Sequence, residues 1–77
     1  MMRMAPMDIT FDPIVPTTER LELFTAFTLA VVARNDRKRT YTVEVPDGTQ
    51  WEWANRLMKV PGVRTVTYTR PRTIADN

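Results

Sequence analysis

Arginine is the residue type in this chain with the most specific binding chemistry. Nine of the eleven cationic side chains are arginines, and they are unevenly distributed along the sequence. Residues 34–39, RNDRKR, contain four cations and one acid, and further arginines stand near the C-terminal end. A guanidinium group donates hydrogen bonds in a fork that matches carboxylates and phosphates. The basic residues that we consider as contacts are Arg34, Arg37, Lys38, Arg39, Arg64, Arg70 and Arg72.

The basic segment 34–39 permits two interpretations. It is a hairpin tip that contacts nucleic-acid phosphates or an acidic protein surface, or it is a solvated turn whose charges keep a sheet soluble. Nucleic-acid binding of this kind would depend steeply on salt concentration. The formal net charge of +2 is too small to indicate binding over the whole protein surface.

The sequence lacks the residues of the common catalytic sites. It contains no histidine, no cysteine and no serine, which excludes Ser-His and Cys-His nucleophiles and thiolate zinc sites. The acidic residues Asp8, Asp12, Glu19 and Glu22 are spread over a segment interrupted by prolines and do not form a calcium-type loop. With only two glycines, a glycine-rich phosphate loop is also excluded. We therefore expect no enzymatic activity, no cofactor, no metal and no small-molecule substrate.

The length of 77 residues predicts one domain, close to the lower size limit for a core without disulfides or metals. We expect a flexible lead at residues 1–7, a single α+β domain at residues 8–70 and a polar tail at residues 71–77. The sequence shows no secretory signal pattern, and its longest apolar stretch is too short for a membrane-spanning helix. A cytoplasmic protein without membrane contact is therefore expected.

The longest apolar stretch, residues 21–33 (LELFTAFTLAVVA), is ambiguous between strand and helix. A helix starting at Thr17 or Thr18 is one alternative, but the β-branched and aromatic side chains favour a strand. Such a strand would be apolar on both faces, and one helix covers only one of them. We therefore expect a partner, either a second copy in a homodimer or another protein. The predicted interface is Phe24, Ala26, Ala30 and Val32, with Trp51.

The remaining elements follow from alternation and from turn residues. A short strand is expected from Asp8, and a hairpin turn at Asn35 and Asp36 precedes a strand with Tyr41 and Val43 on one face. Thr49 stands three residues before Glu52, the spacing of a helix capping box. The helix predicted from this signal ends at Pro61 and Gly62, and a strand is predicted at residues 63–70.

The aromatic residues of the helix and the neighbouring strands have alternative roles. On the predicted helix, one face carries Trp53, Ala54, Leu57, Met58 and Val60, while Trp51 lies at its margin. Trp51 is either an interface anchor at the rim or a cover for the end of the core. Tyr41 and Tyr68 either pack under the helix or form stacking platforms for a single strand of nucleic acid, and we favour the core.

The segment in which a helix ends in Val-Pro-Gly-Val and an alternating Arg-Thr-Val-Thr-Tyr strand follows resembles the helix-to-strand turn of ferredoxin-like modules. The resemblance covers about twenty residues, and it implies a packing arrangement but no functional residue. The predicted fold is α+β, with a mainly antiparallel sheet of three or four strands in the order (β)ββαβ and one amphipathic helix packed on one face.

The function expected from these features is a small non-enzymatic protein–protein interaction module, such as an inhibitor, an adaptor or an assembly subunit. An apolar sheet face would supply the stable contact, and the arginine-rich tip would supply electrostatics at the rim. The first alternative is a nucleic-acid-binding module that contacts phosphates through residues 34–39 and the C-terminal arginines. The second is a structural subunit of a larger particle such as a virion.

Overall fold

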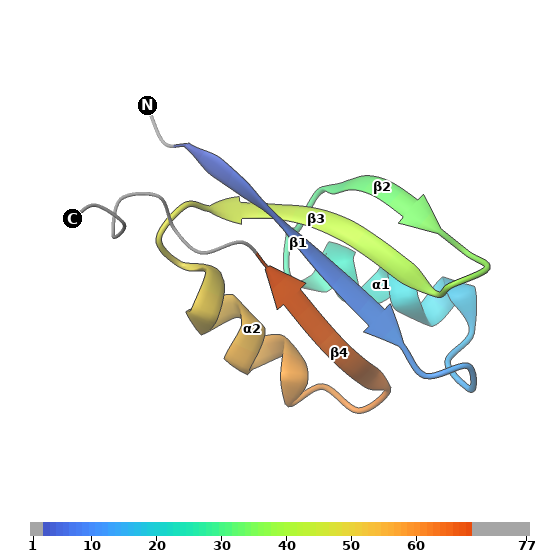
Figure 1. Cartoon of the computed structure of the whole chain (residues 1–77). Coiled ribbons are helices and arrows are strands. Elements are labelled where there is room, and N and C mark those ends of the chain that lie inside the picture. The colour runs from blue at the N-terminus through green and yellow to red at the C-terminus, as the bar shows by residue number, and fades with distance from the viewer. Residues whose placement is uncertain (1–2, 69–77) are drawn as a thin grey trace.

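The computed structural model describes residues 3–68, which form a β-α-β-β-α-β arrangement (Figure 1). The elements are β1 (Met4–Phe11), α1 (Thr17–Ala26), β2 (Val31–Asn35), β3 (Thr40–Pro46), α2 (Gln50–Met58) and β4 (Val63–Tyr68). The predicted α+β class with an antiparallel sheet is confirmed. Two helices are present where the sequence analysis predicted one.

The four strands form one antiparallel sheet in the order β2-β3-β1-β4. This chain order of elements is that of the ferredoxin-like fold, in agreement with the resemblance noted at the end of the helix. Both helices lie on the same side of the sheet (Figure 1). The opposite face of the sheet is not covered by either helix. Neither helix of residues 3–68 is long and apolar enough to cross a lipid bilayer.

The core lies between the sheet and the two helices. Alternate residues of β1 and β3 point into it, and the register places Ile9 opposite Tyr41 and Met7 opposite Val43. Phe24 of α1 and Leu57 of α2 pack against these strand residues. The rings of Phe11, Phe24 and Tyr41 form a cluster with centroids 5.5–5.7 Å apart.

Residues 21–33 do not form the predicted strand. Their first part belongs to α1, which begins at Thr17 after Pro16, the helix start that the sequence analysis considered as the alternative. Phe24 is fully buried in the core and lies one helical turn after the buried Arg20, so helical spacing directs both side chains toward the sheet. Tertiary packing of this face therefore outweighs the strand preference of the individual residues. The strand face that required a partner does not exist.

The first strand begins earlier than predicted. β1 includes residues 4–7, which the sequence analysis assigned to a flexible lead, and Ala5 and Met7 are buried beneath the helices. Met4 and Ala5 pair with Pro46 and Val45 of β3. The proline at position 6 lies within this strand, although proline cannot donate to the ladder. The segment 71–77, predicted to be a polar tail, lies outside the described residues.

The second helix starts where it was predicted, with Thr49 as its N-cap residue, but the capping box does not form. The Thr49 hydroxyl instead donates to the carbonyl oxygen of Pro46 at 2.6 Å. The Gln50 side chain accepts from the Gly48 N–H at 2.6 Å and donates to Asp47 at 2.9 Å. The turn before α2 is therefore held by side chains of the turn itself. On α2, Ala54 and Leu57 are buried as predicted, whereas the placement of Met58 on the buried face is wrong, because Met58 lies at the outer flank of the helix and is 49% exposed.

Candidate functional site

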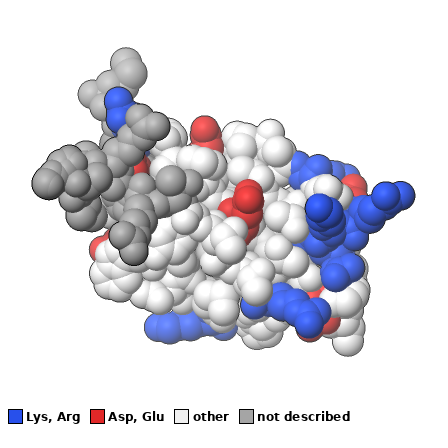
Figure 2. Space-filling model, in the orientation of Figure 1, with Lys and Arg blue, Asp and Glu red and all other residues white. Residues whose placement is uncertain are grey.

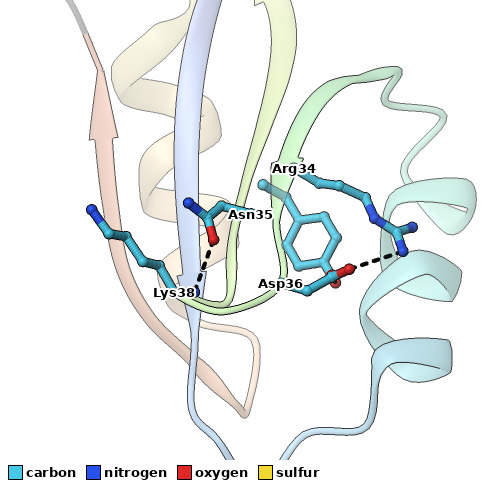
Figure 3. Close-up of polar contacts among 5 residues, drawn as sticks. Arg34, Asn35, Asp36 and Lys38 are labelled. Carbon is cyan, nitrogen blue, oxygen red and sulfur yellow. Dashed lines mark hydrogen bonds and ion pairs between the residues drawn. The ribbon is translucent and has the colours of Figure 1, made fainter.

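The basic hairpin tip predicted from residues 34–39 connects β2 and β3 (Figure 3). The Lys38 N–H donates to the Asn35 side-chain oxygen at 3.1 Å, and the Arg39 N–H donates to the Asp36 carbonyl oxygen at 3.2 Å. Arg39 closes the turn in the left-handed region, with φ of 57°. The predicted hairpin through Asn35 and Asp36 is confirmed.

Asp36 connects two side chains of the hairpin. Its Oδ2 atom accepts from Arg34 at 3.1 Å, and its Oδ1 atom accepts from the Tyr41 hydroxyl at 3.1 Å. Arg34 and Asp36 are both exposed, so the ion pair itself contributes little to stability. The positive charge of Arg34 is nevertheless partly compensated by Asp36, whereas Arg37, Lys38 and Arg39 form no ion pair within residues 3–68.

The other cations of the tip differ in how firmly they are held. The Nε atom of Arg39 donates to the carbonyl oxygen of Phe11 at 3.2 Å, which ties the tip to the end of β1. The Arg37 and Lys38 side chains are exposed and make no ion pair or hydrogen bond among residues 3–68. Arg37 and Lys38 are therefore the tip cations most available to a partner.

Arg64 lies at the same end of the sheet as the hairpin tip. The register of β4 shifts at this point, because Val63 pairs with Phe11 and Thr65 pairs with Thr10, and exposed Arg64 occupies the resulting bulge. Basic side chains gather at this end of the molecule (Figure 2). We call this surface the cationic end; its members are Arg20, Arg34, Arg37, Lys38, Arg39 and Arg64. The predicted contacts Arg70 and Arg72 lie outside the described residues.

Arg20 is a member of the cationic end that the sequence analysis missed. Its side chain is only 6% exposed, its Nε atom donates to the Val15 carbonyl oxygen at 2.9 Å, and its Cζ atom lies 5.9 Å from the centroid of the Phe11 ring. The sequence signal was the four-residue spacing between Arg20 and Phe24, which puts both on one face only if the segment is a helix. Assigning the segment as a strand hid this signal.

The predicted apolar interface is wrong as a continuous surface. Phe24 is in the core, with 1% of its surface exposed, and is not available to a partner. Ala26, Ala30 and Val32 are exposed, but they belong to the end of α1, the following connection and β2. Because the segment is not one strand, its even-numbered residues do not share a face.

A different apolar surface lies along α2 and β4. Trp51 is 57% exposed, and Met58 stands seven residues later on the same side of α2. This side points away from α1, because Trp53 on the other flank of the helix contacts Phe27 of α1 with the ring centroids 5.9 Å apart. Tyr68 is partly exposed at the end of edge strand β4. We call Trp51, Met58 and Tyr68, together with the outer edge of β4, the β4-side surface.

The two tyrosines differ in their exposure. Tyr41 is fully buried, as the core assignment predicted, whereas Tyr68 is partly exposed. The uncovered face of the two central strands carries Asp8 and Thr10 from β1 and Thr42 and Glu44 from β3, without an aromatic side chain. A stacking platform of the kind used by RNA-binding sheets is therefore contradicted for β1 and β3.

Two hollows are lined by described residues near these surfaces. One of about 250 Å³ is lined by Pro6, Asp8, Thr67 and Tyr68, and another of about 90 Å³ by Thr49, Glu52, Trp53 and Arg56. Residues 3–68 contain no group of three acidic side chains arranged to hold a metal ion. The contact surfaces considered below are the cationic end and the β4-side surface.

Comparison of this chain with known protein families, curated proteins and solved structures finds no match.

Proposed function

We propose that the chain is a cytoplasmic, non-enzymatic protein-binding module that pairs with a second copy of itself through the β4-side surface. The observation that carries this proposal is that exposed Trp51 lies on α2, the helix that packs against β4, and that no strand of residues 3–68 pairs with the outer edge of β4. An exposed tryptophan next to a free strand edge combines an apolar anchor with main-chain hydrogen-bonding groups.

The edge of β4 is suited to strand pairing. It is the last strand of the sheet, and its sequence VRTVTY is rich in β-branched residues. Edge strands are commonly protected by charges, prolines or bulges. In β4 this protection is confined to the bulge at Arg64, near the start of the strand. No strand of residues 3–68 pairs with the outward main-chain donors and acceptors in the second half of β4.

The side chains beside this edge favour a protein partner. Tryptophan, tyrosine and methionine are enriched at the centres of protein interfaces. Trp51, Met58 and Tyr68 are all among the exposed large apolar residues of the described chain. Trp51 lies near the beginning of α2 and Met58 at its end, so antiparallel pairing of two copies would bring Trp51 of each toward Met58 of the other.

Charge supports a second copy as the partner. The cationic end includes the start of β4, whereas Glu44, Asp47 and Glu52 lie toward the end of β3 and the start of α2. Antiparallel pairing of β4 with its copy would place the cationic end of each protomer beside the acidic part of the other. Such complementarity favours the antiparallel over the parallel arrangement, although Arg3 lies beside Asp47 at the acidic end.

The proposal is tested by the solution mass of the full chain, measured by size-exclusion chromatography with light scattering. We expect a dimer that Trp51→Glu converts to a folded monomer. Val32→Glu is the matched control, because Val32 is 53% exposed and lies on the opposite edge strand, β2. This control should remain dimeric. A monomeric wild-type chain, or a dimer that survives Trp51→Glu, would contradict the proposal.

A second candidate function is nucleic-acid binding through the cationic end. The observation in its favour is that the fold brings Arg64 to the same end of the sheet as Arg37 and Lys38, although they are far apart in sequence. Contacts would be made to phosphates and would carry no base specificity. Fluorescence anisotropy with a labelled oligonucleotide should then show binding that weakens steeply between low and physiological salt. Binding that is insensitive to Arg37→Glu and Lys38→Glu would reject this candidate.

A further inference from the structure

Arg20 occupies a position where an apolar residue would be expected. Its side chain is 6% exposed on the sheet-facing side of α1, and it is the only charged residue among the buried residues of the described chain. Removing a guanidinium from water is costly unless hydrogen bonds and a counter-charge compensate for it. The surroundings of Arg20 therefore indicate whether this compensation is complete.

The compensation that residues 3–68 supply to Arg20 is partial. The Nε atom donates to Val15, and the guanidinium lies over the Phe11 ring at a distance within the range of a cation–π contact. No carboxylate of the described residues lies within ion-pair distance of Arg20. Its two terminal nitrogens have no partner in the same residues, and neither is sealed from solvent. The group is thus held through Nε and the Phe11 ring, while its unpartnered terminal nitrogens keep a small contact with solvent.

Arg39 is held in a similar way next to the same phenylalanine. Its Nε atom donates to the Phe11 carbonyl oxygen at 3.2 Å, and its own carbonyl oxygen accepts from the Phe11 N–H at 2.9 Å. Its terminal nitrogens also have no partner within residues 3–68. Phe11 therefore anchors two guanidinium groups, Arg20 against its ring and Arg39 against its backbone.

We propose that the free terminal nitrogens of Arg20 and Arg39 bind a phosphate group at the cationic end. Each arginine keeps donors for a bidentate contact, and each has already lost side-chain freedom through its Nε bond, which lowers the entropic cost of binding. Arg37, Lys38 and Arg64 add positive potential around this position. The ligand is a phosphate ion or a phosphate of a nucleic-acid backbone. This site is independent of self-association through the β4-side surface.

The test is a titration of the full chain with inorganic phosphate at constant ionic strength, followed by the NMR signals of the arginine Nε–H groups. We expect saturable shifts of the Arg20 and Arg39 signals, with a dissociation constant in the millimolar range, roughly 1–10 mM. Absence of saturable shifts up to about 50 mM phosphate would overturn the proposal.

Three variants distinguish a specific phosphate site at Arg20 and Arg39 from nonspecific electrostatic attraction. Arg39→Gly suits the left-handed backbone at this position and removes the guanidinium, so it should weaken binding about tenfold while the chain stays folded. Arg20→Lys should weaken binding similarly, since lysine lacks the fork. The control Lys38→Gln removes an equal charge without an anchored group and should change affinity less than about twofold. Equal losses for Lys38→Gln and Arg39→Gly would overturn the proposal. If Arg20→Lys does not fold, the comparison of phosphate affinity between Arg39→Gly and Lys38→Gln is sufficient to test the proposal.

The source of the phosphate is distinguished by repeating the titration with a short single-stranded oligonucleotide. Tighter binding than that of inorganic phosphate, with the same sensitivity to Arg39→Gly, supports a nucleic-acid phosphate. Saturable binding of inorganic phosphate without oligonucleotide binding supports the free ion. Oligonucleotide binding that ignores Arg39→Gly, combined with no phosphate shifts, overturns the site and leaves only nonspecific attraction by the cationic end.

Discussion

The hydroxyl of Tyr41 donates to Oδ1 of Asp36 at 3.1 Å, so that a fully buried ring of the sheet core is bonded to an exposed carboxylate of the hairpin tip. The other oxygen of Asp36 accepts from Arg34 (Figure 3). The Tyr41 ring in turn packs against Phe11 and Phe24. The position of the basic tip is therefore coupled to the packing of the aromatic cluster.

Substitutions of Asp36 should separate the contribution of its hydrogen bond with Tyr41 to stability from the contribution of its ion pair with Arg34. Asp36→Asn keeps an acceptor for Tyr41 and loses an exposed ion pair, so the free energy of unfolding should fall by less than about 1 kcal/mol. Asp36→Ala removes the acceptor as well and should cost about 1 kcal/mol more, close to the cost of Tyr41→Phe. Urea denaturation measures these differences. Equal losses for Asp36→Asn and Asp36→Ala would show that charge, and not the Tyr41 hydrogen bond, holds the tip.

The two glycines provide a matched test of steric fit. Both have positive φ, 99° for Gly48 and 94° for Gly62, but a Cβ atom on Gly62 would lie 2.5 Å from Cγ2 of Val15, whereas one on Gly48 meets nothing within 4 Å. We expect Gly48→Ala to cost about 1 kcal/mol from backbone strain. Gly62→Ala should cost about 2–3 kcal/mol.

A second substitution that removes the clashing methyl group of Val15 provides the control for Gly62→Ala. Combining Gly62→Ala with Val15→Ala should recover part of the loss, since the contacted methyl group is then absent. Thermal and urea unfolding of the two single variants and the double variant form the required cycle. Strictly additive losses would show that the Val15 contact does not limit the substitution.

The two tryptophans should respond in opposite ways to truncation. Trp53 is half-buried, contacts the Phe27 ring and lies under the Arg56 guanidinium, with Cζ 4.9 Å from the ring centroid. Trp53→Ala should therefore lower the stability of the monomer by about 2–4 kcal/mol. Trp51→Ala should change it by less than about 0.5 kcal/mol. Both are measured by urea unfolding at a concentration below that of any self-association; a larger loss for Trp51 would contradict its assignment to the surface.

The elements that sequence patterns predicted well are those with clear periodicity and clear ends. Strand β3 alternates strictly between buried and partly exposed residues, and Gly48 follows it in a turn that requires positive φ. Helix α2 has a well-defined buried face and is followed by Pro61 and Gly62. Local chemistry was sufficient in these segments because no distant contact reverses the local preference.

Helix α1 was predicted only as the alternative to a strand, because each of its usual signals is weak. Its N-cap residue is Pro16, without a side-chain cap, and no glycine follows its last turn. Its buried face carries Arg20, a charge where an apolar residue would have completed the pattern. The same charge is part of the candidate phosphate site. The position of Arg64 beside the hairpin tip could not be predicted from local sequence either, because it depends on the pairing of β4 with β1, which lies at the opposite end of the chain.

The end of α1 also yields a stabilising substitution. The Leu29 N–H donates to the Phe24 carbonyl oxygen at 2.8 Å and the Thr28 N–H donates to that of Thr25 at 3.1 Å, which together form a Schellman motif. Thr28 occupies its left-handed position with φ of 58°, where a β-branched residue is strained and glycine is usual.

We expect Thr28→Gly to raise the free energy of unfolding by about 1 kcal/mol, because removing the strained Cβ outweighs the added chain entropy. Thr25→Gly is the matched control. Thr25 lies within the helix, and its hydroxyl donates to the Leu21 carbonyl oxygen at 3.2 Å, so glycine there should destabilise the protein by roughly 0.5–1 kcal/mol. Urea unfolding of both variants shows whether each substitution raises or lowers the free energy of unfolding. If Thr28→Gly destabilised the chain as Thr25→Gly does, residue 28 would not adopt the left-handed conformation, and the segment would not end as a helix there.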